Sequence, residues 1–169
     1  MSAGALTPYG QGMRRFRSLL AITCVALLAG CSSSIPADPE GTLERVTGGT
    51  LRVGVSESPP WVETTEHGEP AGTEPDLVRE FAERLGAEPE WTEDGEEHLM
   101  EALERGELDL VIGGFTDTTP WVDFGAVTVP YAADERDGTR EKHVMIVRMG
   151  ENAFLVALER FLLAEGASA

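Results

Sequence analysis

The sequence predicts an α/β domain with a mostly parallel sheet and helices on both faces. Three segments have strand character, at residues 51–55 (LRVGV), 88–93 and 108–113 (LDLVIG). Between them lie two stretches whose apolar residues recur at helical spacing, and each of these stretches ends at a glycine. Because the order strand, helix, strand, helix, strand favours parallel pairing through right-handed crossovers, we expect a layered α/β sheet.

The helices are expected from their apolar faces and their end signals. The first begins at Thr73, which has capping-box spacing to Asp76, and Gly86 ends it. The second opens at residues 94–97 and ends at Gly106. The third ends at Gly166. Their inward residues are Leu77, Val78, Phe81, Ala82 and Leu85 in the first, Leu99, Ala102 and Leu103 in the second, and Phe154, Leu155, Leu158, Phe161 and Leu162 in the third.

The remaining segments complete one domain over residues 50–166. Residues 126–131 and 143–148 (HVMIVR) have strand character, and we expect the charged stretch 134–141 between them to be a loop. About 115 residues suffice for a hydrophobic core. Polar residues 31–49, which are rich in Ser, Pro and Gly, predict a flexible tether ahead of this domain.

The N-terminal 30 residues predict a lipoprotein signal peptide. Arg14, Arg15 and Arg17 precede a twelve-residue, almost wholly apolar run, 19–30, which is too short to cross the roughly 30 Å core of a bilayer. The sequence LAGC at its end resembles the bacterial lipobox, so we expect lipid attachment at Cys31 and an extracytoplasmic, membrane-anchored location. An ordinary signal with a chance cysteine is the alternative. Met13 directly precedes the arginines and offers a second start position.

Charge limits the partners. After removal of residues 1–30, ten basic and thirty acidic residues remain, a formal net charge of −20. Nucleic acids and anionic bilayers both require a basic face, so we exclude nucleic acid and expect the lipid to hold the protein at the membrane. Because Cys24 leaves with the signal and Cys31 carries lipid, no pair of thiols remains for a disulfide.

The topology predicts a ligand site between the first and third strands. Ligands of open parallel sheets bind beyond the carboxyl ends of strands, where the winding reverses. The two loops that would meet there are residues 56–73, with Pro59-Pro60-Trp61, and residues 114–123. The second loop begins at the pair Gly113-Gly114 and contains three threonines and a second indole, Trp121. Backbone N–H groups and hydroxyls of the second loop suit an anion such as a carboxylate. The ligand-binding candidates are Trp61, Gly114, Phe115, Thr116, Thr118 and Trp121; alternatively, the two tryptophans cap the sheet as core residues and the threonines only stabilise the turn.

These segments resemble, in this order, the bacterial extracellular solute-binding protein family 3, the receptors of polar amino-acid ABC importers. LRVGV, the Pro-Pro-aromatic loop, G-x-x-x-D-L at 72–77, ALERGELDLVIGG, the Thr-x-Thr turn and VDF…PY at 122–131 carry the resemblance, and residues 143–162 resemble the family's closing strand and helix. The resemblance implies one lobe of a type II periplasmic-binding-protein-like fold, a small-molecule solute as ligand and an ABC permease as partner.

Two departures separate this chain from the family pattern. Only eleven residues lie between Tyr131 and His143, where the family carries its whole second lobe. The family turn runs Thr-x-Thr-x-x-Arg, and Trp121 stands where that arginine binds the α-carboxylate. With one lobe and no arginine, we expect binding to be weak or assisted by a partner.

Three functions remain open. The first is a solute-binding protein that serves a transporter, and the second is a lipoprotein module for interaction with the cell envelope or for sensing, without transport. The third, an enzyme, is disfavoured because we find no pairing of a nucleophile with a base, and the spacing predicts no metal site and no cofactor. His67, His98 and His143 are expected to be solvated.

Overall fold

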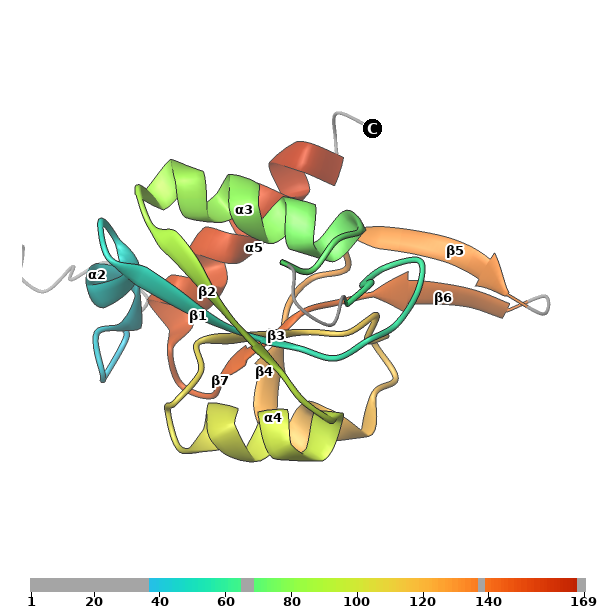
Figure 1. Ribbon diagram of the computed structural model, residues 1–169, viewed down its shortest axis with the longest axis horizontal. Coiled ribbons are helices and arrows are strands. Elements are labelled where there is room, and N and C mark those ends of the chain that lie inside the picture. The colour runs from blue at the N-terminus through green and yellow to red at the C-terminus, as the bar shows by residue number, and fades with distance from the viewer. Residues whose placement is uncertain (1–36, 65–68, 137–138, 167–169) are drawn as a thin grey trace, which may run out of the picture. The chain divides into compact units, whose positions relative to one another are not determined.

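A computed structural model describes residues 37–64, 69–136 and 139–166 (the described residues). Its centre is a five-stranded sheet in the order β2-β1-β3-β7-β4 (Figure 1). The strands are β1 (Thr50–Val55), β2 (Glu88–Glu93), β3 (Leu110–Ile112), β4 (Gly125–Val127) and β7 (Ile146–Arg148). β1 pairs in parallel with both β2 and β3, whereas β7 runs antiparallel to β3 and β4. The predicted mostly parallel sheet is therefore confirmed.

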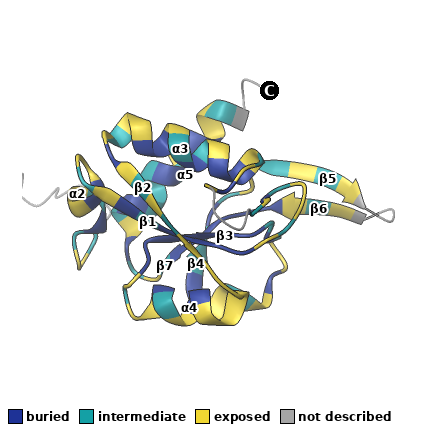
Figure 2. Cartoon of the chain, in the orientation of Figure 1, coloured by how far each residue is buried: buried dark blue, intermediate teal, exposed yellow. Residues whose placement is uncertain are grey.

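Helices cover both faces of the sheet, as predicted. α3 (Thr73–Leu85) and α5 (Asn152–Gly166) lie on one face, and α4 (Glu96–Glu104) lies on the other (Figure 1). Side chains of a single strand alternate between the two faces: Leu110 and Ile112 of β3 join the cluster under α3 and α5, while Val111 joins the cluster under α4. Each face thus has its own hydrophobic core, and the central strands are buried on both sides (Figure 2).

The residues predicted to face the core from the helices are buried or half-buried, but the predicted N-terminal cap of α3 is wrong. Phe81, Leu99, Leu158 and Leu162 are among the residues at most 2% exposed. Gly86 ends α3 in the left-handed conformation, as expected, with a φ of 64°. The predicted capping box at Thr73 is wrong, because the N-cap is Gly72 and no side chain caps the helix. Gly72 has a φ of 114°, and a Cβ there would lie 2.5 Å from the carbonyl oxygen of Trp61, so the chain requires glycine.

The charged stretch predicted as a loop is a β-hairpin instead. β5 (Ala132–Arg136) pairs antiparallel with β6 (Thr139–His143), and the hairpin extends away from the main sheet (Figure 1). Its charged side chains gave no apolar alternation, so the pattern on which strand prediction rests was missing. The hairpin occupies the position at which the family pattern carries a second lobe.

The predicted tether is wrong over the residues that the structure describes. α2 (Thr42–Val46) packs on the domain with Val46 fully buried. Oδ1 of Asp38 accepts hydrogen bonds from the N–H groups of Ala153 and Phe154 at 2.6 and 3.0 Å, and so caps α5. The carboxylate of Glu151 in turn accepts the N–H groups of Glu40 and Thr42. The folded part therefore begins before residue 50, while the predicted signal, Cys31 and the first residues of the tether lie outside the described residues.

Candidate functional site

The loops after β1 and β3 meet where the topology predicted. β1 lies between β2 and β3, so the winding of the sheet reverses between β1 and β3. The N–H of Ser56, directly after β1, donates to the carbonyl of Ile112 at 3.0 Å, which holds the two loops together at their start. The first loop folds back on itself through an isolated bridge between Ser58 and Val62, and the Pro59–Pro60 peptide bond is cis.

Trp61 stacks on a histidine rather than standing free. Its ring lies 3.9 Å from that of His143, centroid to centroid, at an interplanar angle of 31°, and it meets Tyr131 edge-on at 6.1 Å. The indole also packs against the cluster under α3 and α5. Its Nε1 is buried without a hydrogen-bond partner among the described residues. Trp61 is thus half-buried, and part of its surface remains beside the loop of Gly114.

The backbone N–H groups predicted to receive an anion are already hydrogen-bonded to a side-chain carboxyl group of the protein. Oε2 of Glu74 accepts the N–H groups of Gly113 and Gly114 at 2.8 and 3.0 Å. Oε1 of the same carboxylate accepts a hydrogen bond from the hydroxyl of Tyr131. The prediction that the N–H groups of both glycines are free for ligand is therefore wrong. Gly114 itself is required, because its φ is 66° and a Cβ would clash with the hydroxyl of Ser58.

Glu74 sets the electrostatics beneath the site. It is completely buried in the first turn of α3, and burial raises the pKa of its carboxyl above the ordinary value of 4.5. The hydrogen bonds from Tyr131 and the two glycines act in the opposite direction, as does the nearby His143. Burial and the neighbouring Glu74 carboxylate raise the pKa of the Tyr131 hydroxyl far above its ordinary range, so the phenol remains the donor of this pair.

The second loop presents its threonine hydroxyls to solvent. Oγ1 of Thr116 and Oγ1 of Thr118 lie 3.0 Å apart in an exposed hydrogen bond. Two backbone hydrogen bonds fasten this loop to the end of the hairpin and the residue after it, from Asp117 N–H to the carbonyl of Lys142 and from Val144 N–H to that of Phe115, both 2.9 Å. The pair of hydroxyls is consequently held at a fixed place beside Gly114.

Phe115 and Trp121 lie differently from the prediction. The Phe115 side chain is only 5% exposed and belongs to the cluster under α4, so it is a core residue rather than a surface for solute. Trp121, in the short 3₁₀ helix η1 (Pro120–Asp123), packs partly on that same cluster. Its Nε1 donates to Oε2 of Glu96 at 2.7 Å. The indole N–H that we expected to be available is therefore used at the start of α4.

One of the three histidines contradicts the expectation that they are solvated. His143 is 1% exposed, and its Nε2 lies 3.0 Å from Oδ1 of Asp134. His98 is exposed and pairs with Asp94, which raises the pKa of its imidazole. His67 lies outside the described residues. No local pattern predicts that His143 is buried, since its burial follows from the stack with Trp61 and from the contact with Asp134 on the hairpin.

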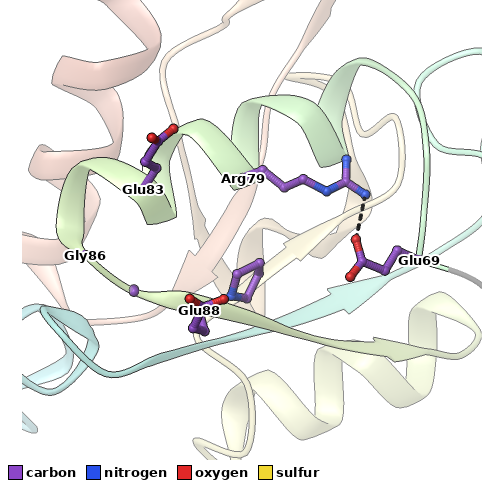
Figure 3. Close-up of a pocket in the computed structure, with 7 residues that line it drawn as sticks. Glu69, Arg79, Glu83, Gly86 and Glu88 are labelled. Atoms are coloured by element: carbon purple, nitrogen blue, oxygen red, sulfur yellow. Dashed lines mark ion pairs between the residues drawn. The ribbon is translucent and has the colours of Figure 1, made fainter.

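A separate pocket lies elsewhere on the domain. It has a volume of about 430 Å³ and lies between α3 and the beginning of β2, at the amino end of the parallel strands (Figure 3). Glu69, Glu83 and Glu88 line it, and its cation, Arg79, is engaged by Glu69 at 3.6 Å and Asp76 at 2.8 Å. Glu69 belongs to the loop after β1, but none of the lining residues is a candidate site residue, so the pocket is not part of the candidate site.

The fold defines a single lobe of a periplasmic-binding-protein-like fold, with the candidate loops at the β1/β3 switch point. Residues 51–167 match the model of the bacterial extracellular solute-binding proteins, family 3, and the chain belongs to that family. No curated protein matches this chain. The family is extracellular by its description, so the protein is extracytoplasmic.

Solved structures of solute-binding proteins share the fold of this lobe. The arginine-bound form of domain 1 from TmArgBP is 29% identical, with a TM-score of 0.63, and the match covers 72% of this chain and 97% of that one. Two further matches show the fold alone. An ancestral cationic amino acid solute-binding protein is 16% identical with a TM-score of 0.65, covering 75% of this chain and 94% of that one. The L-cystine receptor of Neisseria gonorrhoeae is 14% identical with a TM-score of 0.61, covering 75% and 91%.

These relatives are solute-binding proteins rather than enzymes, although one ancestral amino-acid-binding neighbour is described as a precursor of cyclohexadienyl dehydratase. Among the described residues, no helix is both long and apolar enough to span a membrane.

Proposed function

We propose that this protein is a lipid-anchored, extracytoplasmic receptor that binds a small solute with its single lobe and serves an ABC permease. The observation that carries the proposal is the match to an isolated lobe: 97% of the domain 1 chain is covered, and that structure is described as arginine-bound. That structure is a precedent for a single lobe of this fold that holds a ligand without the second lobe. The family membership supplies the class of ligand, a small solute.

The solute would bind over Trp61, Gly114 and the Thr116–Thr118 hydroxyls. These groups lie side by side, since a Cβ on Gly114 would be 3.2 Å from Cδ1 of Trp61 and the hydroxyl pair follows two residues later. Glu74 places its carboxylate behind the Gly113 and Gly114 N–H groups, which reduces their attraction for a second anion. The indole face and the strongly acidic chain favour a cationic or aromatic solute.

The sequence that precedes Cys31 supports the anchoring part of the proposal, which is lipid attachment at that cysteine. The arginines, the apolar run and the LAGC sequence have the order of a lipoprotein signal. Cys31→Ser should move the protein from the membrane fraction to the soluble fraction of its native host. Cys24→Ser, within the apolar run, is the matched control and should leave the protein at the membrane. Equal distribution of wild type and Cys31→Ser would contradict lipid anchoring.

A second candidate is a module that binds another protein or envelope material. It is favoured by two large apolar side chains beside the candidate site, Val122 and Phe124, which are 45% and 39% exposed. Phe124 meets Trp121 edge-on at 5.6 Å, so the three residues form one apolar surface on and directly after η1. The lobe would then present this surface to a partner instead of delivering solute to a permease.

Titration of the purified protein with solutes distinguishes the two. Arginine, glutamine, glutamate and simple amines are added in turn while tryptophan fluorescence and the melting temperature are followed. We expect saturable binding of the cationic solutes, and Trp61→Ala should abolish it. Trp91→Phe changes an indole on β2 that lies beside Thr64 and Pro70 rather than beside Gly114; it is the control and should retain binding. No response to any solute would favour the interaction module.

A further inference from the structure

The base of the hairpin brings together three side chains that can ligate a metal ion. In the β5–β6 register, Asp134 lies opposite Glu141 and Ala132 lies opposite His143. Because side chains alternate along a strand, Asp134, Glu141 and His143 share one face of the hairpin. One ligand atom from each lies within 4.8 Å of the others, and His143 Nε2 is 3.0 Å from Asp134 Oδ1.

We propose that this face of the hairpin binds a first-row divalent metal ion, with Zn²⁺ as the reference, through Asp134, Glu141 and His143. An imidazole nitrogen with two carboxylates suits Zn²⁺ and its neighbours better than Mg²⁺ or Ca²⁺, which prefer oxygen alone. Zinc ligands at bond lengths of about 2.0 Å lie roughly 3.3 Å apart in a tetrahedron, close to the spacing of Asp134 and His143. Rotation of the Glu141 side chain brings in the third ligand.

Asp134 and Glu141 lie directly opposite each other on the paired strands, so one ion can contact both carboxylates. Each carboxylate has two oxygens with about four lone-pair sites, so it can keep another hydrogen bond or ion pair while ligating a metal.

His143 is held ready as a ligand. The ring is 1% exposed and stacked on Trp61 at 3.9 Å, so its orientation is fixed before an ion arrives. Its Nδ1 is buried and has no hydrogen-bond partner among the described residues. Without an ion, Nε2 carries the proton and donates it to Oδ1 of Asp134; when an ion binds, the proton of the neutral ring moves to Nδ1 and Nε2 coordinates the metal. Three protein ligands leave a fourth position for water, as in open zinc sites.

Calorimetric titration of the full chain with ZnCl₂ tests the proposal. The chain carries Cys24→Ser and Cys31→Ser, because thiolates bind zinc on their own. We expect saturable binding of one ion per chain. Asp134→Asn and Glu141→Gln should each weaken it by about tenfold or more, since even the loss of an outer hydrogen-bond partner of a metal ligand costs that much. His143→Gln should abolish it.

Two matched variants separate a built site from general attraction to an acidic surface. Glu135→Gln removes the same charge from the opposite face of the same strand, and His98→Gln removes an exposed histidine paired with Asp94. Both should bind Zn²⁺ as the parent does. Co²⁺ should also quench Trp61 fluorescence, because the His143 ring stacks on that indole. Absence of saturable binding, or equal losses in Glu135→Gln and Glu141→Gln, would overturn the proposal.

Discussion

The hydroxyl of Tyr131 donates a hydrogen bond to the buried carboxylate of Glu74, which also accepts the N–H groups of Gly113 and Gly114. This one carboxylate joins three segments that are far apart in the sequence: the start of α3, the loop after β3 and the start of the hairpin. All three border the candidate solute site. Glu74 therefore positions the site from beneath. A change in its charge state should alter the hydrogen bonds that hold each of these segments.

Glu74 should make stability fall as pH rises. Burial raises its pKa in the native protein above 4.5, the ordinary value for glutamate. Between the ordinary and the raised pKa, the unfolded chain releases the proton while the native protein retains it. The native state then binds more protons, so its free energy of unfolding decreases with increasing pH, and this contribution is lost above the raised pKa. We expect the difference in unfolding free energy between wild type and Glu74→Gln to decrease across this window, as measured by urea denaturation at several pH values.

The comparison with Glu74→Gln is needed because other carboxyls act in the opposite direction. Hydrogen bonds from Arg148 and Arg105 lower the pKa values of Glu40 and Glu107, and groups with lowered pKa stabilise the native state as pH rises. Those contributions cancel between wild type and variant. Glu83→Gln, on the exposed side of the same helix, should show no such trend. A difference that increases with pH would mean that the three hydrogen bonds outweigh burial.

Substitution of Asp38 tests whether residues 37–49 are folded onto the domain. Its carboxylate accepts the N–H groups of Leu43, Ala153 and Phe154, and so caps α2 and α5 together. We expect Asp38→Ala to reduce the free energy of unfolding by about 0.5–2 kcal/mol, the range found for helix caps. Asp76→Ala, which removes only an exposed pair with Arg79, should cost about 0.5 kcal/mol or less. An equal, small effect of both changes would restore the view that residues 37–49 are a tether.

Phe81 tests the core under α3 and α5. The side chain is 2% exposed and meets Phe154 and Phe161 at ring distances of 5.8 and 5.5 Å. Phe81→Ala should lower the free energy of unfolding by about 3–5 kcal/mol, because it leaves a cavity among these rings. Leu163→Ala on α5, where the leucine is 58% exposed, should change it by less than about 0.5 kcal/mol. Thermal or urea unfolding of both variants gives the comparison.

The periodic parts of the domain could be predicted because burial imposes a pattern on the sequence. The alternation in residues 51–55 and the spacing of Val78, Phe81 and Ala82 each report one packed face. The hairpin escaped prediction because its strands are charged and lack such a face. α2 was missed because it has only five residues, and because glycine and proline around it favoured a loop.

The location of the candidate site could be predicted from the sequence, but the groups that determine its chemistry could not. Strand order alone located the two loops, and Trp61 and Gly114 do meet there. The role of Glu74 could not be read from the sequence, since an acid in the first turn of a helix normally faces solvent or caps the helix. His143 likewise becomes buried only through tertiary contacts with Trp61 and Asp134. The position of Glu74, directly before Pro75 in the family's G-x-x-x-D-L segment, was the one local feature that could have marked it as a candidate site residue.

Trp121 offers the sharpest test of which solute the lobe prefers. The family resemblance places an arginine there, and a guanidinium binds a carboxylate through two charge-assisted hydrogen bonds that an indole cannot provide. Trp121→Arg alone would pair with Glu96, whose Oε2 now accepts the indole N–H at 2.7 Å. We therefore expect Trp121→Arg combined with Glu96→Gln to bind arginine about tenfold or more tightly than wild type, and the amine that lacks its carboxylate no more tightly.

Calorimetric titrations of the two solutes against wild type, the double variant and Glu96→Gln alone decide this. Glu96→Gln alone should behave as wild type towards arginine, because it adds no cation. Trp121→Lys with Glu96→Gln should gain less than the arginine variant, since an ammonium cannot form the bidentate pair. If wild type already binds arginine tightly and the double variant gains nothing, then the Thr116–Thr118 turn holds the carboxylate unaided. Trp121 would then be a packing residue of η1 with no part in the choice of solute.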